Sequence, residues 1–152
     1  MRKIALGVVT SVALAVSMFG AVEAAQAATG EVVLRNNDTG LCVDRPQEVT
    51  ERPMQAFTAE CDGAGTQRWV YSETEQTVRA ADTGLCLGAG WATGVFVVDC
   101  GNGSFVNWVH GSDGRLRLRE WQPGCLEDTR SEQLTWGGCD NQANEVWSLT
   151  TV

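Results

Sequence analysis

The sequence predicts an all-β fold made of three copies of one structural unit. Cysteine and tryptophan recur at intervals of 39 residues, as Cys61, Cys100 and Cys139 and as Trp69, Trp108 and Trp147. The stretch DTGLC stands at 38–42 and again at 82–86, and a shorter version, PGC, stands at 123–125. A fixed period near 40 residues is typical of folds built from repeated units. No helical period is sustained after residue 28.

The first 27 residues precede the repeats and have the layout of a secretory signal peptide. Arg2 and Lys3 are followed by an apolar run over 4–20 and by the small residues AQA at 25–27. A membrane helix is the alternative reading, but no basic flank follows the run. We therefore expect an extracellular mature domain over 28–152. The alanine-rich start and the preference for arginine over lysine suggest a bacterial source.

Each unit divides into four short runs rich in β-branched and aromatic residues, separated by Gly, Asn and Asp, which is the pattern of strands and turns. The first unit, about 31–71, gives strands at 31–35, 41–43, 55–61 and 67–71. The second, about 76–110, gives 77–80, 85–87, 94–100 and 107–110. The third, about 115–150, gives 115–119, 125–127, 133–139 and 145–149. Twelve short strands in three repeats around a pseudo-threefold axis predict a β-trefoil, with six strands closing a barrel and six capping one end.

All six cysteines lie in the mature domain, two in each unit. An even number in an exported chain indicates disulfides. Spacing alone leaves fifteen connectivities open, but the repeat favours pairing inside each unit: Cys42–Cys61, Cys86–Cys100 and Cys125–Cys139. A metal site is a weak alternative, because there is no CxxC pair and His110 is the only histidine.

The mature domain is acidic, with nine arginines and no lysine against eighteen Asp and Glu, or a net charge of −9. Such a charge disfavours nucleic acid and anionic membranes as partners. The sequence contains no GxSxG, HExxH or Walker motif. We therefore expect a non-catalytic protein without a cofactor.

The stretch GLCVD at 40–44, followed by Cys61 and by QRW at 67–69, resembles the ricin B-type lectin domains. The resemblance covers the whole mature chain and implies a β-trefoil that binds carbohydrate. The other units keep the tryptophan, but Val106 and Glu145 replace the glutamine. In these lectins a carboxylate lies two residues after the first cysteine and an aromatic residue two before the second. An asparagine precedes the glutamine.

Unit 1 is the best match to this set of positions. It has Asp44 at the carboxylate position and Gln67 in the motif, but Ala59 at the aromatic position and Thr66 at the asparagine position. Phe57 is expected on the same strand face as Ala59. The loop over 45–54, which is longer than in the other units, is a further candidate for shaping this site.

Unit 3 is the second candidate and unit 2 is expected to have no site. Unit 3 offers Glu127, its neighbour Asp128, and Asn144, with Gly137 at the aromatic position and Trp136 facing the opposite side. Unit 2 has Gly88, Val98 and Phe105 at the three positions.

The sequence thus predicts a secreted, non-catalytic carbohydrate-binding module. The alternative is a secreted module or inhibitor that binds an extracellular protein, in which case Trp91 and Trp121, expected in loops, become the residues of interest. The three core tryptophans are expected to pack rather than to bind. The sequence leaves the sugar, the partner and the oligomeric state open.

Overall fold

The computed structural model describes residues 30–48, 52–101 and 105–152. The expected signal peptide, 1–27, and part of the loop over 45–54 lie outside the described residues. Unit 1 contains β1 (Glu31–Asn36), β2 (Cys42–Asp44), β3 (Met54–Gln55), β4 (Phe57–Ala59) and β5 (Trp69–Ser72). Unit 2 contains β6 (Thr77–Ala80), β7 (Cys86–Ala89), β8 (Val95–Val98) and β9 (Trp108–His110). Unit 3 contains β10 (Leu116–Leu118), β11 (Cys125–Asp128), β12 (Leu134–Gly137) and β13 (Trp147–Thr151).

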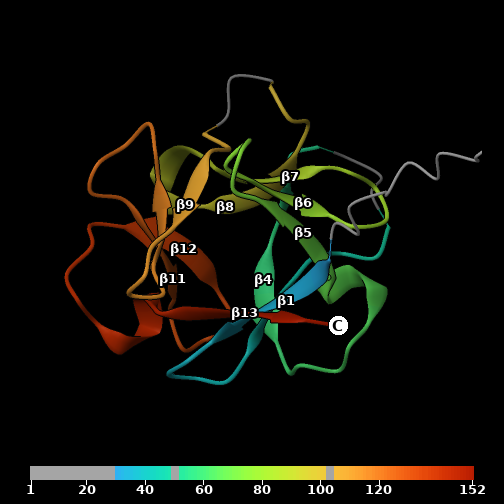
Figure 1. Cartoon of the computed structure of the whole chain (residues 1–152), viewed down its shortest axis with the longest axis horizontal. Coiled ribbons are helices and arrows are strands. Elements are labelled where there is room, and N and C mark those ends of the chain that lie inside the picture. The colour runs from blue at the N-terminus through green and yellow to red at the C-terminus, as the bar shows by residue number, and fades with distance from the viewer. Residues whose placement is uncertain (1–29, 49–51, 102–104) are drawn as a thin grey trace, which may run out of the picture.

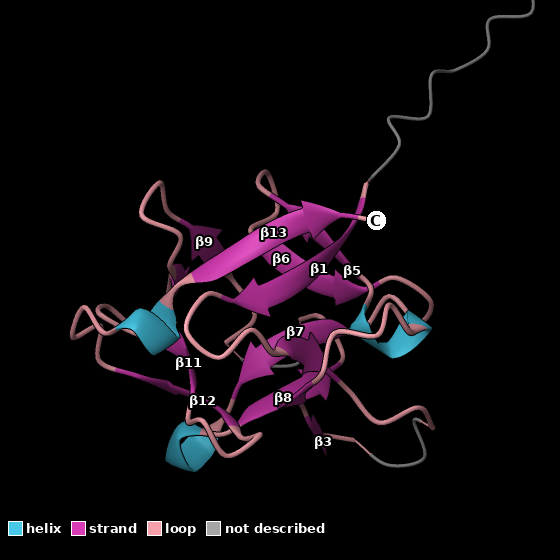
Figure 2. Cartoon of the chain, turned by 90° about the horizontal axis from the view of Figure 1, so that it is seen from below, coloured by secondary structure: helices cyan, strands magenta, loops and turns pink. Residues whose placement is uncertain are grey.

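These strands form the expected β-trefoil, with the three units arranged around the centre of the molecule (Figure 1). The first and last strands of the units form the barrel, in which β1 pairs with β13 and β5, β5 with β6, and β9 with β10. The inner strands form the hairpins β2–β4, β7–β8 and β11–β12. Seen from the side, the barrel strands β13, β1 and β6 lie at one end and β8, β3 and β12 at the other (Figure 2). In the part of the chain that the structure describes, no helix is long and apolar enough to span a bilayer.

The structure has thirteen strands rather than twelve, because the third strand of unit 1 changes partner at Ala56. Before this residue β3 pairs with β8 of unit 2, and after it β4 pairs with β2 of its own unit. The Ala56 N–H bonds to the Val95 carbonyl between the two segments. The structure also contains three single 3₁₀ turns that the sequence did not predict: η1 (Gly65–Gln67), η2 (Trp91–Thr93) and η3 (Ala143–Glu145).

The three repeated tryptophans form the centre of the core, which confirms their expected packing role. Their side chains are buried, together with the leucines and valines that the barrel strands and hairpins turn inward. Each indole N–H donates to the carbonyl of the residue that follows the unit's first cysteine: Trp69 to Val43 at 3.1 Å, Trp108 to Leu87 at 2.9 Å and Trp147 to Leu126 at 2.9 Å. The 39-residue period therefore records one buried hydrogen bond made three times.

The predicted disulfides are confirmed, each inside its own unit. The Cα atoms of Cys42 and Cys61 are 5.1 Å apart, those of Cys86 and Cys100 are 5.2 Å apart, and those of Cys125 and Cys139 are 5.1 Å apart. Each bond joins the start of the second strand of its unit to the segment after the hairpin. In the chain-entropy model each such loop contributes about 3 kcal/mol to stability.

The repeated DTG turn joins the first two strands of units 1 and 2. Gly40 and Gly84 have φ values of +75° and +69°, which a residue with a side chain rarely adopts. The Gly40 N–H bonds to the Asn36 carbonyl, and the Gly84 N–H bonds to the Ala80 carbonyl. The turn thus needs glycine, which explains why these letters recur.

Candidate functional site

Asp44 and Phe57 lie directly opposite each other on β2 and β4 of unit 1. Side chains of opposite residues in an antiparallel pair share a face, so the carboxylate has an aromatic neighbour although Ala59 occupies the expected aromatic position. Phe57 is half-buried, and Asp44 keeps 8% of its surface exposed. Asp44 Oδ1 accepts the Arg45 N–H at 2.7 Å and Oδ2 accepts Gln67 Nε2 at 3.0 Å. The carboxylate is therefore held in one orientation at the edge of the hairpin.

Gln67 orients this carboxylate but has no surface to offer a ligand. It is completely buried on η1. Its Nε2 donates both to Asp44 and to the Glu60 carbonyl, at 2.8 Å, and its Oε1 accepts the Asp62 N–H at 3.1 Å. Gln67 is thus a positioning residue rather than a contact residue.

The position of Gln67 is solved differently in each unit. In unit 3 Glu145 is buried and accepts three hydrogen bonds, from the Asp140 N–H at 2.7 Å, the Asn141 N–H at 3.1 Å and Arg115 Nε at 2.8 Å. In unit 2 Val106 packs against Val98 and the Cys86–Cys100 disulfide. Both polar residues fasten the loop before the core tryptophan, whereas the valine fills the same space by apolar contact.

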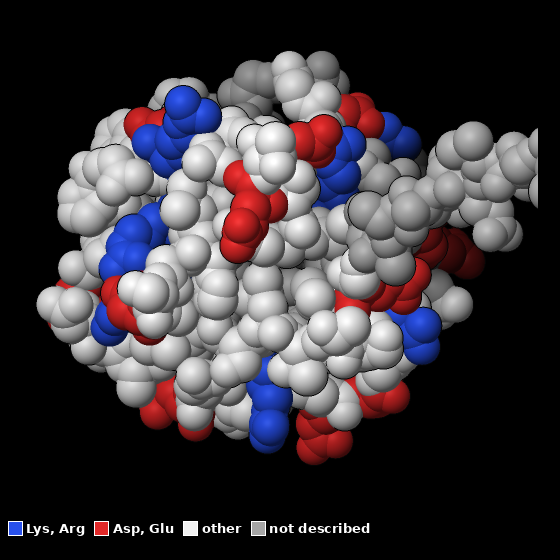
Figure 3. Space-filling model, viewed as in Figure 1, with Lys and Arg blue, Asp and Glu red and all other residues white. Residues whose placement is uncertain are grey.

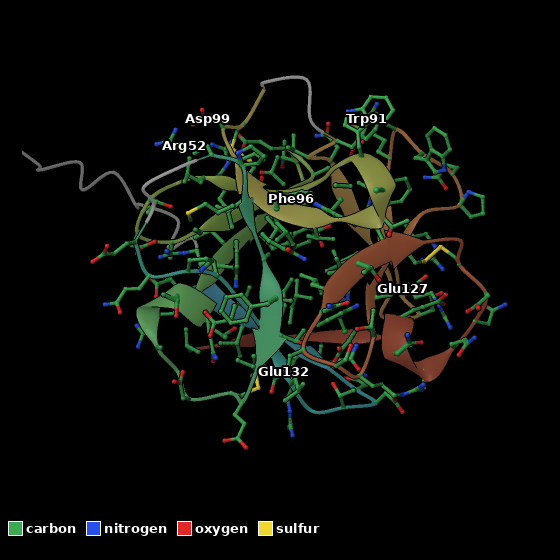
Figure 4. The ribbon with its side chains drawn as sticks, turned by 180° about the vertical axis from the view of Figure 1, so that it is seen from behind. Arg52, Trp91, Phe96, Asp99, Glu127 and Glu132 are labelled. Carbon is green, nitrogen blue, oxygen red and sulfur yellow. A yellow bond between two sulfur atoms is a disulfide. The ribbon has the colours of Figure 1, made fainter. Side chains whose placement is uncertain are left out.

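Glu127, the carboxylate of unit 3, is half-buried on β11 and lies over Gly137. A Cβ at Gly137 would come within 2.7 Å of Glu127 Oε1, so the carboxylate itself occupies the space where an aromatic side chain was expected. Burial raises the pKa of the Glu127 carboxyl, and the nearby charges of Glu145 and Asp140 raise it further. Figure 4 shows Glu127 on this side of the molecule.

Asp128 and Asn144 do not join Glu127. Asp128 is completely buried, because alternate residues of β11 face opposite sides and its side chain turns toward unit 1. Its carboxylate accepts the hydroxyls of Thr39 and Thr58 and the Arg130 N–H. Asn144 Nδ2 donates to the Asp128 carbonyl at 3.0 Å. Both residues hold units 3 and 1 together, which corrects the expectation that they face a ligand beside Glu127.

The corresponding face of unit 2 is filled by apolar side chains. A Cβ at Gly88 would lie 2.9 Å from Val98 Cγ2 and 3.2 Å from Val106 Cγ1. There is no carboxylate and no space at this position, in line with the expectation of no site in unit 2.

The sequence did not predict the pocket that lies on the opposite side of the β7–β8 hairpin. It has a volume of about 380 Å³, and Phe105, Trp91, Trp121 and Trp136 lie in its wall. Trp91 and Trp121 were identified as loop residues, but nothing in the sequence indicated that they meet Trp136. We call this the seam pocket, because it lies at the boundary between units 2 and 3.

Comparison with known proteins agrees with this architecture. The family model described as "Ricin-type beta-trefoil lectin domain" matches residues 30–147. No curated protein matches the sequence significantly. Similar solved structures include the designed threefold-symmetric protein ThreeFoil, at 17% identity and a TM-score of 0.68, with 81% of this chain and 99% of that chain covered. The β-trefoil lectin of the Vibrio vulnificus hemolysin/cytolysin is 22% identical, with a TM-score of 0.67 and coverage of 80% and 94%.

The agglutinin from Abrus precatorius is 20% identical, with a TM-score of 0.67, and the match covers 79% of this chain and 48% of the agglutinin chain. At these identities the structures show a shared fold. The family model spans most of the described residues, including all three disulfides and all three core tryptophans. The chain therefore belongs to the ricin-type β-trefoil lectin domain family.

Proposed function

We propose that this chain is a secreted, non-catalytic carbohydrate-binding module whose principal site is in unit 1. Membership of a lectin domain family supports this function, and the similar Vibrio vulnificus lectin has N-acetyl-D-lactosamine bound. The N-terminal pattern and the three disulfides support secretion, because disulfides persist in oxidising compartments. On the face seen in Figure 3, acidic and basic side chains are interspersed, which suits a neutral ligand better than a highly charged one.

The oriented carboxylate of Asp44 is the observation that carries the proposal. A carboxylate has about four lone-pair positions, and the two protein donors to Asp44 leave the others for sugar hydroxyls. Phe57, directly across the hairpin, offers an apolar surface to the C–H face of the same ring. Gln67 holds the carboxylate still, so that little side-chain freedom is lost when a ligand binds.

His110 is the only histidine, and its surroundings support a non-catalytic role. Its Nε2 lies 3.1 Å from the Trp147 carbonyl, and its backbone N–H bonds to the Tyr71 hydroxyl at 3.0 Å. The Tyr71 ring packs edge-on against the imidazole. These contacts place the histidine in the barrel, on a different element from Asp44 and Phe57.

A glycan array probed with residues 28–152 and with two matched variants tests the proposal. Asp44→Asn and Glu127→Gln each neutralise the carboxylate at the same position of a different unit. Removing a charged acceptor from ligand hydroxyls costs about 1.5–3 kcal/mol, or about ten- to a hundredfold in affinity. We expect this loss for Asp44→Asn and parental binding for Glu127→Gln at the unit 1 site.

Equal binding by Asp44→Asn and the parent would refute the assignment to unit 1. Because Asp44 also accepts two protein hydrogen bonds, the melting temperature of each variant is measured alongside, and affinities are compared at a temperature where both are folded. Failure of the parent to bind any glycan would refute sugar binding and favour the alternative of an extracellular protein partner.

A further inference from the structure

The three boundaries between units, which we call seams, are closed in different ways. The residue three positions after the first cysteine of each unit points toward the next unit, and these residues are Arg45, Ala89 and Asp128. Arg45 is buried and forms an ion pair with Asp82 in the turn of unit 2. Asp128 accepts the hydroxyl of Thr39 in the turn of unit 1. Polar contacts thus close two of the three seams.

The seam between units 2 and 3 has no such polar contact from its equivalent residue. Ala89 is too short to reach the next unit, and the turn of unit 3 carries Trp121 where the other turns carry DTG. The seam pocket lies in the space that remains, with Ala89 and Gly90 on one side and Trp121 and Trp136 on the other. The difference between the seams explains why a pocket of this kind lies here and not in the contacts of Arg45 or Asp128.

The walls of the pocket are held in place by specific contacts. Trp136 Nε1 donates to the Gly90 carbonyl at 3.0 Å, which joins β12 to the loop after β7. The Trp121 ring stands edge-on to Trp136, with centroids 5.9 Å apart and an angle of 72° between the planes. A Cβ at Gly90 would come within 2.7 Å of Phe96, so glycine is needed for the loop to close over that ring. The pocket is therefore formed before any ligand binds.

Trp91 stands at the mouth of the pocket and is 97% exposed, and Trp121 is 55% exposed. Figure 4 shows Trp91 projecting from the edge of the molecule. The next two residues, Ala92 and Thr93, have positive φ values of 55° and 66°, which are unfavourable for residues other than glycine. Such strain is often found where a loop presents a functional side chain. Within the described residues neither the Trp91 nor the Trp121 indole N–H has a protein acceptor, so both can donate to a ligand.

We propose that the seam pocket is a second glycan site, which takes a neutral sugar ring by its apolar face; this proposal rests on the lectin function proposed above. Aromatic rings form most of the wall, and no charged side chain is part of it. Its volume is at the small end of the range of about 300–1,000 Å³ for small-molecule sites. The free indole N–H groups suit ring hydroxyls, which a purely apolar ligand lacks. The net charge of −9 further disfavours sialylated or sulfated sugars.

This site is separate from the carboxylate position of unit 2. Successive residues of β7 face opposite sides, so Gly88 faces the filled apolar space beside Val98 and Val106, whereas Ala89 faces the seam. The pocket also lies away from Asp44, whose hairpin belongs to unit 1. The two sites can therefore be tested independently.

Iodide quenching of tryptophan fluorescence distinguishes the two sites. Trp69, Trp108 and Trp147 are buried, and no exposed tryptophan lies on the hairpin of Asp44. The strongest neutral glycan from the array is added to the parent, to Asp44→Asn and to Trp121→Ala. We expect the glycan to protect Trp91 and Trp121 from iodide in the parent and equally in Asp44→Asn.

Trp121→Ala should weaken this protection about tenfold in glycan concentration, as loss of a central aromatic contact typically does, and Trp121→Phe should restore most of it. The exposure of Trp121 makes both variants compatible with folding, which melting curves check. The sialylated counterpart of the same glycan should protect much less than the neutral one.

The outcomes separate the two proposals. Glycan binding without protection of tryptophan in the parent would overturn the seam site and leave the unit 1 site standing. Equal protection by the sialylated glycan would overturn the preference for neutral sugars. Protection by the apolar dye N-phenyl-1-naphthylamine, but by no glycan, would make the pocket an apolar site and overturn the proposal. If no glycan binds at all, both proposals fail.

Discussion

Replacement of Glu145 by glutamine tests the role of the buried carboxylate in unit 3. Gln67 occupies the same position in unit 1, so an amide fits the available volume. The partners differ, however. Glu145 is completely buried and faces three donors, the N–H groups of Asp140 and Asn141 and Nε of Arg115. An amide supplies one acceptor oxygen and two donors, so it cannot satisfy all three.

The cost follows from the hydrogen bonds that survive. If the amide oxygen takes the place of Oε2, the bonds from Asn141 and Arg115 remain and the Asp140 N–H faces an NH₂ group. One unsatisfied buried donor costs about 1–3 kcal/mol, and the loss of charge at Arg115 adds about 1 kcal/mol. Arg115 keeps its ion pair with Asp113 at 3.0 Å. The total, about 2–4 kcal/mol, is thus smaller than the 3–5 kcal/mol typical of a buried ion pair with one partner removed.

Urea unfolding at pH 7, with the disulfides intact, measures this difference. For a domain of this size a loss of about 2–4 kcal/mol lowers the melting temperature by about 8–16 °C. Gln67→Glu is the reciprocal control: it places a second carboxylate beside Asp44 and should also destabilise. A loss below about 1 kcal/mol for Glu145→Gln would refute the requirement for a full carboxylate at this position.

Three further changes follow from the structure. Trp69→Ala removes a buried indole and its bond to the Val43 carbonyl, and should cost about 3–5 kcal/mol in urea unfolding; a variant as stable as the parent would contradict its core role. Asp113 is held by Arg117 and Arg115, and the bond to Arg117 lowers the pKa of its carboxyl most. Asp113→Asn should therefore be less stable than the parent at pH 7, and the difference should disappear as the pH falls below about 4; a gap that does not change with pH would contradict this. The raised pKa of Glu127 has the opposite sign, because the ionised form is disfavoured in the folded state. Glu127→Gln should raise the urea midpoint at pH 7 and have little effect once the pH is low enough to protonate Glu127 in both states; an unchanged midpoint at pH 7 would contradict the burial effect.

The sequence predicted the parts of the fold that repeat. The tryptophan and cysteine periods indicated the core and the disulfides correctly, because each of these residues makes the same contact in every unit. The break at Ala56 could not be predicted, since it depends on the Val95 carbonyl of another unit. The extra strand is a consequence of that tertiary contact.

The candidate site was predicted less completely, because neighbours in sequence face opposite directions. Glu127 and Asp128 are adjacent, yet the first lies near the surface and the second is buried against Thr39 and Thr58. Asp44 was placed correctly at the edge of its hairpin, but the complete burial of Gln67 was not evident. The seam pocket combines Trp91, Trp121 and Trp136 from three segments, so only the folded chain brings them together.

The closure of the seams has a consequence for engineering symmetric proteins. Unit 1 carries Arg45 at its leading edge and Asp38 in its turn, at the same place in the DTG motif as Asp82. A tandem array of three copies of unit 1 would therefore set Arg45 opposite Asp38 at every junction, in the arrangement that Arg45 and Asp82 already adopt. Unit 1 is self-complementary in this respect. Unit 2 presents alanine and aspartate and unit 3 presents aspartate and tryptophan, so neither could close a ring of identical copies by the same ion pair.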